Sequence, residues 1–121
     1  MEIAYVNVFV TDLDRAIEFY RSTLGLELLH ATPEHGYASF AAGPARLGLV
    51  VAGADQHELV GRHTGVGLNV DDLEKEHARL AGRGVAFPMP PTRQPWGGFM
   101  ALAADPDGNV FYLDQISAIR S

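Results

Sequence analysis

The sequence predicts an α+β fold in which two βαβββ modules make up a single domain. Three observations point to it. Strand-like and helix-like segments alternate, both helix candidates begin after an aspartate, and the second half repeats the first. In the repeat, residues 65–73 mirror residues 5–13, so that Asp72 stands 60 positions after Asp12. A repeat of this length bears on the whole topology and outweighs local propensity. The 121 residues suit one compact domain.

The first strand is expected at residues 3–10, where valines alternate with Tyr5, Asn7 and Phe9. Successive side chains of a strand point to opposite faces. One face is therefore aliphatic and suited to packing. The other face carries a phenol, an amide and a phenyl ring.

A helix is expected over residues 13–24, where apolar residues recur at helical spacing. Asp12 is a candidate N-cap, and Gly25 is the kind of residue that ends a helix. Three short strand candidates, separated by glycine turns, complete this half: residues 26–31, 37–42 and 46–52.

Residues 53–63 are polar and non-periodic, and we interpret them as a connector. This divides the domain into module one (residues 1–52) and module two (residues 64–121). The second module repeats the strand-and-cap pattern at residues 65–72. It continues with a helix candidate at 73–82 and strand candidates at 85–88, 99–104 and 109–115.

Several short segments, in their order and spacing, resemble the vicinal oxygen chelate superfamily of glyoxalases, bleomycin-resistance proteins and extradiol dioxygenases. The similarity spans nearly the whole chain. It implies open, curved mixed sheets that cup a small-molecule ligand, and chains that pair as homodimers. The segments are Val10-Thr11-Asp12-Leu13-Asp14-Arg15-Ala16, Phe19-Tyr20, Leu24-Gly25-Leu26, Val70-Asp71-Asp72-Leu73 and Asp105-Pro106-Asp107-Gly108-Asn109.

The resemblance also indicates where metal-dependent relatives hold a divalent ion. In this chain those positions are Tyr5, Gly65 and Tyr112, with a fourth near Leu49 or Val50. A divalent ion at such a site needs about three imidazole or carboxylate ligands. Phenols, a glycine and an aliphatic side chain do not supply them. We therefore expect no metal and no cofactor, which puts the metal-dependent chemistries of the family in doubt.

The candidate site is instead a ligand-binding surface of aromatic, amide and glycine residues. Aromatic walls with a few polar groups suit a planar, partly polar organic molecule. His63 joins the set if the second-module strand extends that far. Trp96, in a Pro/Gly-rich loop, either contacts ligand or covers the core or a dimer interface. The candidate residues are Tyr5, Asn7, Phe9, His63, Gly65, Asn69, Trp96, Met100 and Tyr112.

The acidic segment Asp105–Asn109 has the composition of a turn, with Pro106 fixing φ and Gly108 suited to positive φ. We interpret it as structural and not as a carboxylate cluster.

Composition narrows the function classes. The formal net charge is −6 and no basic run occurs, which argues against nucleic acid or an anionic membrane as partner. Cysteine is absent and no signal-like segment opens the chain, so we expect a cytoplasmic protein. The leading hypothesis is a binding protein that sequesters an aromatic compound such as an antibiotic. The alternatives are a lyase, isomerase or dioxygenase with an atypical site and, more weakly, a scaffold or regulatory partner.

Overall fold

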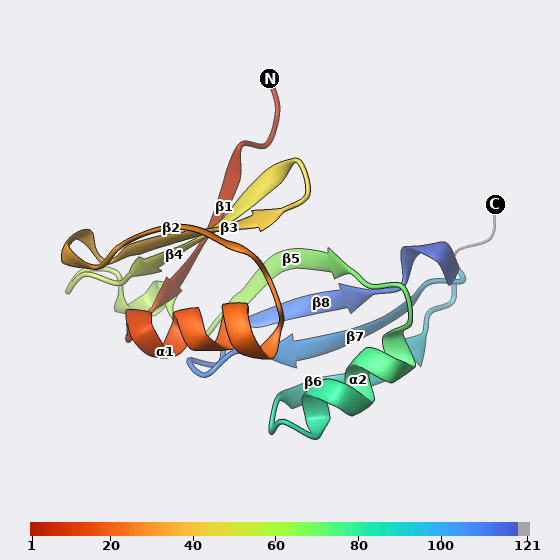
Figure 1. The fold of residues 1–121 in the computed structure, drawn as a ribbon. Coiled ribbons are helices and arrows are strands. Elements are labelled where there is room, and N and C mark those ends of the chain that lie inside the picture. Colours follow the sequence, from red (N-terminus) through yellow and green to blue (C-terminus); the bar gives the residue numbers. More distant parts are fainter. Residues whose placement is uncertain (119–121) are drawn as a thin grey trace. The chain divides into compact units, whose positions relative to one another are not determined.

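The computed structural model describes residues 1–118, which form two compact units. Unit 1 comprises Met1–Arg62 and Pro106–Asn109, and unit 2 comprises His63–Asp105 and the chain from Val110 onward. Each unit contains one four-stranded mixed sheet and one α-helix, as labelled in Figure 1. The predicted α+β class with two βαβββ repeats is confirmed.

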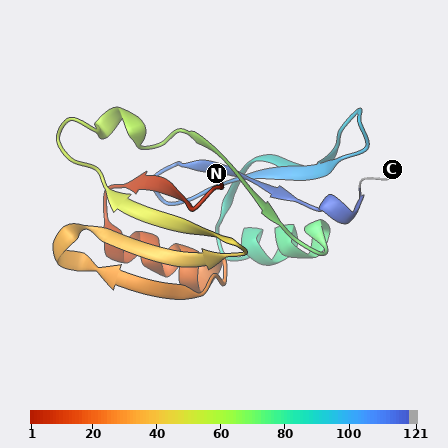
Figure 2. The same cartoon turned by 90° about the horizontal axis from the view of Figure 1, so that it is seen from above.

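The sheet of unit 1 has the strand order β1-β4-β3-β2. Strand β1 (Tyr5–Val10) runs parallel to β4 (Ala45–Val51), and the remaining neighbours are antiparallel. Strands β3 (Tyr37–Ala42) and β2 (Leu28–Thr32) complete it. Figure 2 shows these strands side by side over helix α1 (Leu13–Glu18).

Helix α1 begins as predicted, because the Arg15 amide donates to Asp12 Oδ1 over 3.1 Å. The α-helical pattern ends early, and a π-helical turn at Phe19–Thr23 continues it. There the Leu24 amide reaches back five residues to the Phe19 carbonyl, at 2.9 Å. Gly25 then adopts φ 88°, which suits the predicted terminating glycine. Periodicity alone does not distinguish one π turn from continued α-helix.

The sheet of unit 2 has the equivalent order β5-β8-β7-β6. Strand β5 (His63–Asn69) runs parallel to β8 (Val110–Asp114), while β7 (Phe99–Ala104) and β6 (Ala86–Arg93) are antiparallel additions. Helix α2 (Leu73–Ala81) is capped by Asp72, whose Oδ1 accepts from the Lys75 amide over 3.1 Å. The short 3-10 turns are Pro33–His35, His57–Leu59 and Ile116–Ala118.

Most predicted strand boundaries differ from the observed ones by one or two residues, and two differences in unit 2 bear on the site. Strand β5 begins at His63, inside the segment expected as connector. Strand β6 runs to Arg93, although residues 85–88 alone were expected. Strand β6 contains three prolines, and proline disfavours a strand because it has no N–H to donate to a neighbouring strand. Residue propensity therefore does not predict a strand over this segment. The strand forms nonetheless because β6 lies at the sheet edge and shifts register twice.

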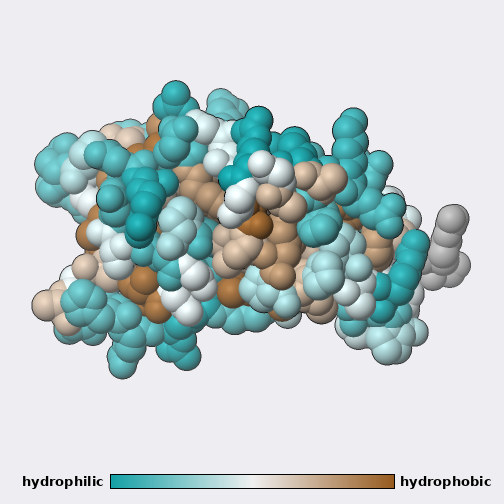
Figure 3. Space-filling view, turned by 90° about the horizontal axis from the view of Figure 1, so that it is seen from below, coloured by the Kyte–Doolittle hydropathy of each residue, from teal (hydrophilic) through white to brown (hydrophobic). Residues whose placement is uncertain are grey.

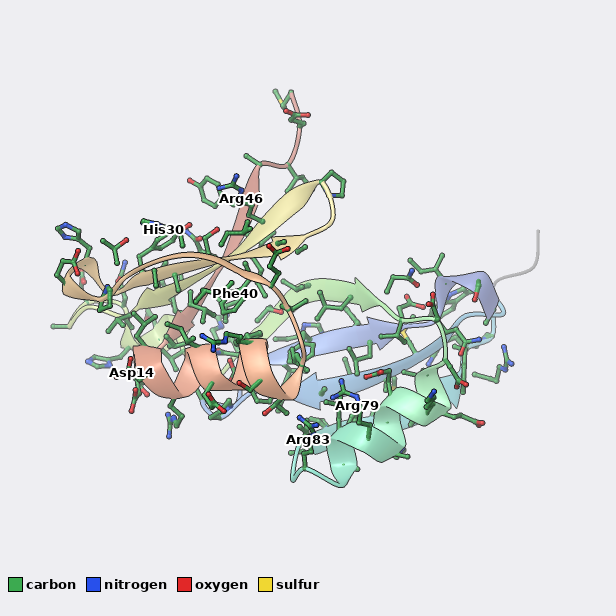
Figure 4. All side chains as sticks on the ribbon, viewed as in Figure 1. Asp14, His30, Phe40, Arg46, Arg79 and Arg83 are labelled. Atoms are coloured by element: carbon green, nitrogen blue, oxygen red, sulfur yellow. The ribbon has the colours of Figure 1, made fainter. Side chains whose placement is uncertain are left out.

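Each hydrophobic core lies between a sheet and its helix. In Figure 4 the side chain of Phe40, which is fully buried, lies between the unit 1 sheet and α1. Burying such a ring contributes roughly 1.5–3 kcal/mol. Other buried residues of unit 1 include Val8, Val10, Leu13, Ala16, Tyr20, Leu47 and Leu49, and those of unit 2 include Leu73, Leu80, Ala101, Ala103, Phe111 and Leu113.

The outer face of α1 is polar, with Asp14, Arg15 and Glu18 exposed. The surface seen from this side carries many hydrophilic atoms, with tan and brown hydrophobic atoms between them (Figure 3). Among the described residues, no helix is long and apolar enough to cross a membrane.

The segment Pro106–Asn109 forms a turn that ties unit 1 together. Asp107 accepts from the Thr11 amide (2.9 Å) and hydroxyl (2.6 Å), and it pairs with Arg15 at 2.8 Å. Asn109 accepts from the Gly61 amide (2.7 Å) and donates to the Phe9 carbonyl (2.9 Å). These polar groups are used within the fold, in agreement with the structural interpretation of the segment.

Candidate functional site

Each sheet has a helix side and an opposite side, which we call its open face. In β1, Val8 and Val10 are buried on the helix side, so the alternate residues Tyr5, Asn7 and Phe9 belong to the open face. Figure 4 shows His30 and Arg46 projecting from the unit 1 sheet on the side away from α1. The pairing register of the strands assigns the remaining residues to one face or the other.

The middle row of the unit 1 open face is polar. Register places Asn7 beside Gly48, Gly48 beside Ser39, and Ser39 beside His30. A flanking row consists of Phe9, Val50, Tyr37 and Thr32, and the other consists of Tyr5, Arg46 and Ala41.

Gly48 forms the floor of this row. A Cβ atom placed on Gly48 would collide with Asn7 Oδ1 and lie 3.2 Å from the Tyr37 hydroxyl. The side chains of Asn7 and Tyr37 therefore reach into the space that a larger residue would fill. Ser39, on the neighbouring strand, is only 4% exposed, and its Oγ has no hydrogen-bond partner among the described residues.

The middle row of the unit 2 open face is largely apolar. Register aligns Gly67, Tyr112, Leu102 and Met89 across the four strands. One flanking row consists of Asn69, Asp114, Met100 and Thr92, and the other of His63, Val110, Ala104 and Ala86. Gly67 leaves open space beside the partly buried phenol of Tyr112.

His63 reaches the open face of unit 2 by an irregular route. The register shifts between His63 and Gly67, and Gly65 at the bulge has φ 75°. Simple alternation, which would put His63 and Gly65 on one face, is interrupted there. His63 is nevertheless paired with Val110, and its ring packs against Tyr112 with centroids 4.9 Å apart.

Two further predicted residues, Asn69 and Met100, lie in one row with Asp114 toward the end of the unit 2 sheet. Asn69 uses its Oδ1 to accept from the Ile116 amide, at 3.2 Å. Beside it, Asp114 has one carboxylate oxygen, Oδ1, that is buried without a partner in the described chain. This acceptor faces the same side of the sheet as Met100 and Tyr112.

Trp96 occupies the tip of the β6–β7 hairpin and is 62% exposed. The Gln94 amide donates to the Gly98 carbonyl over 2.8 Å and so closes the turn. An indole this exposed does not cap the core of unit 2. Of the predicted roles of Trp96, contact with a ligand and contact with a second chain agree with this exposure.

Register corrects one of the four positions at which metal-dependent relatives hold an ion. Asn7 pairs with Gly48 as Gly67 pairs with Tyr112, so the position equivalent to Tyr112 is Gly48. The expectation of Leu49 or Val50 was wrong. Leu49 is buried on the helix side, and Val50 lies one row along.

The four positions thus carry two phenols, Tyr5 and Tyr112, and two glycines, Gly48 and Gly65. Phenols and bare backbone do not fit a divalent metal ion, which prefers imidazole, thiolate or carboxylate ligands. Within residues 1–118, no three His, Asp or Glu side chains gather closely enough to hold one. These residues do not fit the metal centre of metal-dependent relatives.

The sequence analysis missed much of the unit 1 open face: His30, Tyr37, Ser39, Arg46 and Gly48. The available signal was the two-residue period of strands 37–42 and 46–52, which puts positions 37, 39, 46 and 48 on a common side once the strands pair. This period assigns residues of different strands to a common face only after the strands are paired, and the sequence pattern does not show the pairing.

Comparisons with known proteins agree with this architecture. The family model described as Glyoxalase/Bleomycin resistance protein/Dioxygenase superfamily matches residues 2–113. An antibiotic binding protein of Streptomyces sp. CB03234, TnmS3, is 36% identical, with a TM-score of 0.81 over 95% of each chain. A member of the superfamily from Sphaerobacter thermophilus is 28% identical, with a TM-score of 0.83 over 95% of this chain and 97% of that one.

An enzyme is also among the relatives. The lactoylglutathione lyase of Haemophilus influenzae is 31% identical over an alignment of 121 positions, gaps included, which covers 89% of this chain and 87% of the enzyme. Both the repeat architecture and the match over residues 2–113 therefore lead to one conclusion: the chain belongs to the Glyoxalase/Bleomycin resistance protein/Dioxygenase superfamily.

Proposed function

We propose that this protein binds a planar aromatic compound, such as an antibiotic, without a metal ion and without altering the compound. The observation that carries the proposal is that neither unit offers metal ligands at these positions: unit 1 has Tyr5 and Gly48, and unit 2 has Gly65 and Tyr112. The similarity to the antibiotic binding protein TnmS3 supports the same class of function.

The open face of unit 2 suits the flat part of such a compound. Tyr112 offers a ring for stacking, and Gly67 beside it has no side chain to obstruct approach. Leu102, Met89 and Met100 extend the apolar surface, and methionine adapts to irregular ligand shapes. Asp114 Oδ1, unpartnered in the described chain, would accept a hydrogen bond from a ligand hydroxyl or amine.

A second candidate is an enzyme with an atypical site, and the similarity to a lactoylglutathione lyase favours it. A reaction without a metal would need a side-chain acid or base. His63, which packs against Tyr112, and Asp114 are the groups on the unit 2 face that could serve.

We also propose that the protein acts in the cytoplasm as a homodimer. The absence of cysteine is compatible with a reducing compartment. Light scattering during gel filtration, repeated at several concentrations, tests the dimer. A mass of one chain at every concentration would contradict it.

Calorimetric titration of metal-stripped protein against a panel of aromatic natural products tests the function. We expect saturable binding with at least one compound, and mass spectrometry should recover that compound unchanged. Tyr112→Ala should weaken binding about tenfold or more, whereas Glu18→Gln, on the outer face of α1, should not. Recovery of a chemically altered compound, or stoichiometric metal in protein purified without added metal, would favour the enzyme.

A further inference from the structure

Ser39 is the unusual residue of the unit 1 open face. Its side chain is 4% exposed, yet its Oγ has no hydrogen-bond partner in the described chain. Leaving a buried hydroxyl unpaired costs about 1–3 kcal/mol. The equivalent position of unit 2 holds Leu102, since Ser39 pairs with Gly48 as Leu102 pairs with Tyr112. The fold therefore accepts a hydrocarbon side chain at this position. We infer that the Ser39 hydroxyl forms its hydrogen bond with a molecule from outside the chain.

The surroundings of Ser39 form a polar floor around Gly48. Asn7 Oδ1 and the Tyr37 hydroxyl converge on the glycine from neighbouring strands. The Asn7 side chain is exposed and makes no hydrogen bond with the described residues, so it can turn aside at little cost. Once the Asn7 amide rotates so that its Nδ2, and not its Oδ1, faces Gly48, a ligand oxygen that enters here would meet donors from Ser39, Asn7 and Tyr37.

Arg46 adds a positive charge at the edge of this floor. Arg46 lies in the flanking row, between Ala41 and Tyr5. Ser39 and Asn7 lie two residues further along the same two neighbouring strands, so each is a diagonal neighbour of Arg46. Diagonal neighbours in a sheet lie roughly 7–8 Å apart, which an arginine side chain spans. Arg46 is exposed and forms no ion pair with residues 1–118, and its counterpart in unit 2 is the uncharged Val110.

The open face of unit 1 has no acidic residue along its strands, although the chain carries a net charge of −6. Its ionisable side chains are Arg46, His30, Tyr5 and Tyr37, of which Arg46 and His30 project together from the sheet in Figure 4. A face without carboxylates in an acidic protein favours anions over cations. His30 is partly engaged, since its Nε2 lies 3.0 Å from Thr32 Oγ1.

We propose that the open face of unit 1 binds an anionic edge of an aromatic compound, a carboxylate or phenolate with an adjacent oxygen. Arg46 recognises the charge, while Ser39 and Asn7 donate hydrogen bonds to the oxygens. The inference rests on the proposed function, because it specifies the class of compound that the binding protein takes.

The test uses a matched pair of probes, an ortho-hydroxynaphthoate and its neutral carboxamide, titrated calorimetrically into the full chain. We expect the carboxylate to bind about tenfold more tightly than the amide, a difference of about 1.4 kcal/mol. Arg46→Gln should abolish this preference, and Arg21→Gln, in the π turn after α1, should leave it intact. Added salt should reduce the preference, as for any exposed charge pair.

Ser39→Ala supplies a second variant, which should weaken both probes about tenfold. Removing an unpaired buried hydroxyl does not threaten folding, and circular dichroism of the variant checks this. Amide chemical shifts of labelled protein should move at Ser39 and Gly48 when the naphthoate is added.

The outcomes separate this inference from the proposed function. Equal binding of the two probes, unaffected by Arg46→Gln, overturns the anionic class while the binding function stands. The same holds if neither probe binds at about 1 mM while another compound of the panel binds. If no compound of the panel binds at all, the proposed function itself fails.

Discussion

The two units share one backbone plan, and their helix sides are alike in kind. In unit 1 the large Phe40 stands beside Leu47, whereas in unit 2 the small Ala103 stands beside the large Phe111. All four residues are buried at 3% exposure or less. The large aromatic ring lies on β3 in unit 1 and on β8 in unit 2, so that both cores remain filled, as close packing requires.

The open faces differ in chemistry. The middle row of unit 1 reads Asn7, Gly48, Ser39, His30, and the equivalent row of unit 2 reads Gly67, Tyr112, Leu102, Met89. Packing against the helix constrains one side of each sheet, and the other side is free to diverge toward a ligand. Under the proposed function, we therefore expect the residues that serve binding to be among those that differ between the repeats.

The largest effect is expected from the helix side. Phe40→Ala should lower the free energy of unfolding by about 3–5 kcal/mol, because it removes a fully buried ring and leaves a cavity. Leu102→Ala, on the partly buried open face of unit 2, should cost clearly less. Urea denaturation of the two variants measures both values. Equal losses would contradict the distinction between the two sides.

The next largest effect on the free energy of unfolding is expected at Asn109, in comparison with Asn69. Asn109→Ala should cost about 2 kcal/mol, since it leaves the Gly61 amide and the Phe9 carbonyl without their partner. Asn69→Ala removes one exposed hydrogen bond and should cost less than about 1 kcal/mol. Thermal unfolding of both variants ranks them. The reverse order would mean that the Pro106–Asn109 turn does not hold unit 1 as described.

Giving unit 2 the polarity of unit 1 should change binding more than folding. Leu102→Ser should weaken a neutral aromatic ligand about tenfold, because the apolar surface beside Tyr112 is lost. Calorimetric titration measures the affinity, and Ala78→Ser on the exposed side of α2 is the matched control. Unchanged affinity of Leu102→Ser would place the aromatic group elsewhere.

The smallest effect has the opposite sign. Ser39→Ala should leave the unfolding free energy unchanged or raise it by up to about 1 kcal/mol, because it deletes a buried hydroxyl without a partner. Chemical denaturation at high precision detects a change of this size. A loss of more than about 1 kcal/mol would show that the hydroxyl is satisfied within the fold.

Much of the fold could be predicted from the sequence because its signals are local. The Asp12 cap, the helix-ending Gly25 and the alternating valines of β1 each report their own structure, and the repeat supplies the topology. The π turn at Phe19–Thr23 and the proline-rich β6 could not be found this way. Both depend on neighbours that the local pattern does not reveal.

The site was predicted less completely. Tyr5, Asn7 and Phe9 could be assigned to one face because a single strand contains them, and the register shows that Met100, Asn69 and Tyr112 also share one face. Gly48 and Ser39 were missed because their position beside Asn7 and Tyr37 follows only from the pairing of the strands. Register, which decides what lies beside what, is set by tertiary contacts and turns.

The prolines of β6 have a consequence for association between copies. An outer strand with free amides and carbonyls can template a strand from another molecule, a common route to aggregation. Pro88, Pro90 and Pro91 offer no N–H for such pairing, and the two register shifts bend the strand further. On the opposite border of this sheet, the bulge in β5 has a similar effect. We therefore expect both borders of the unit 2 sheet to resist sheet-to-sheet polymerisation.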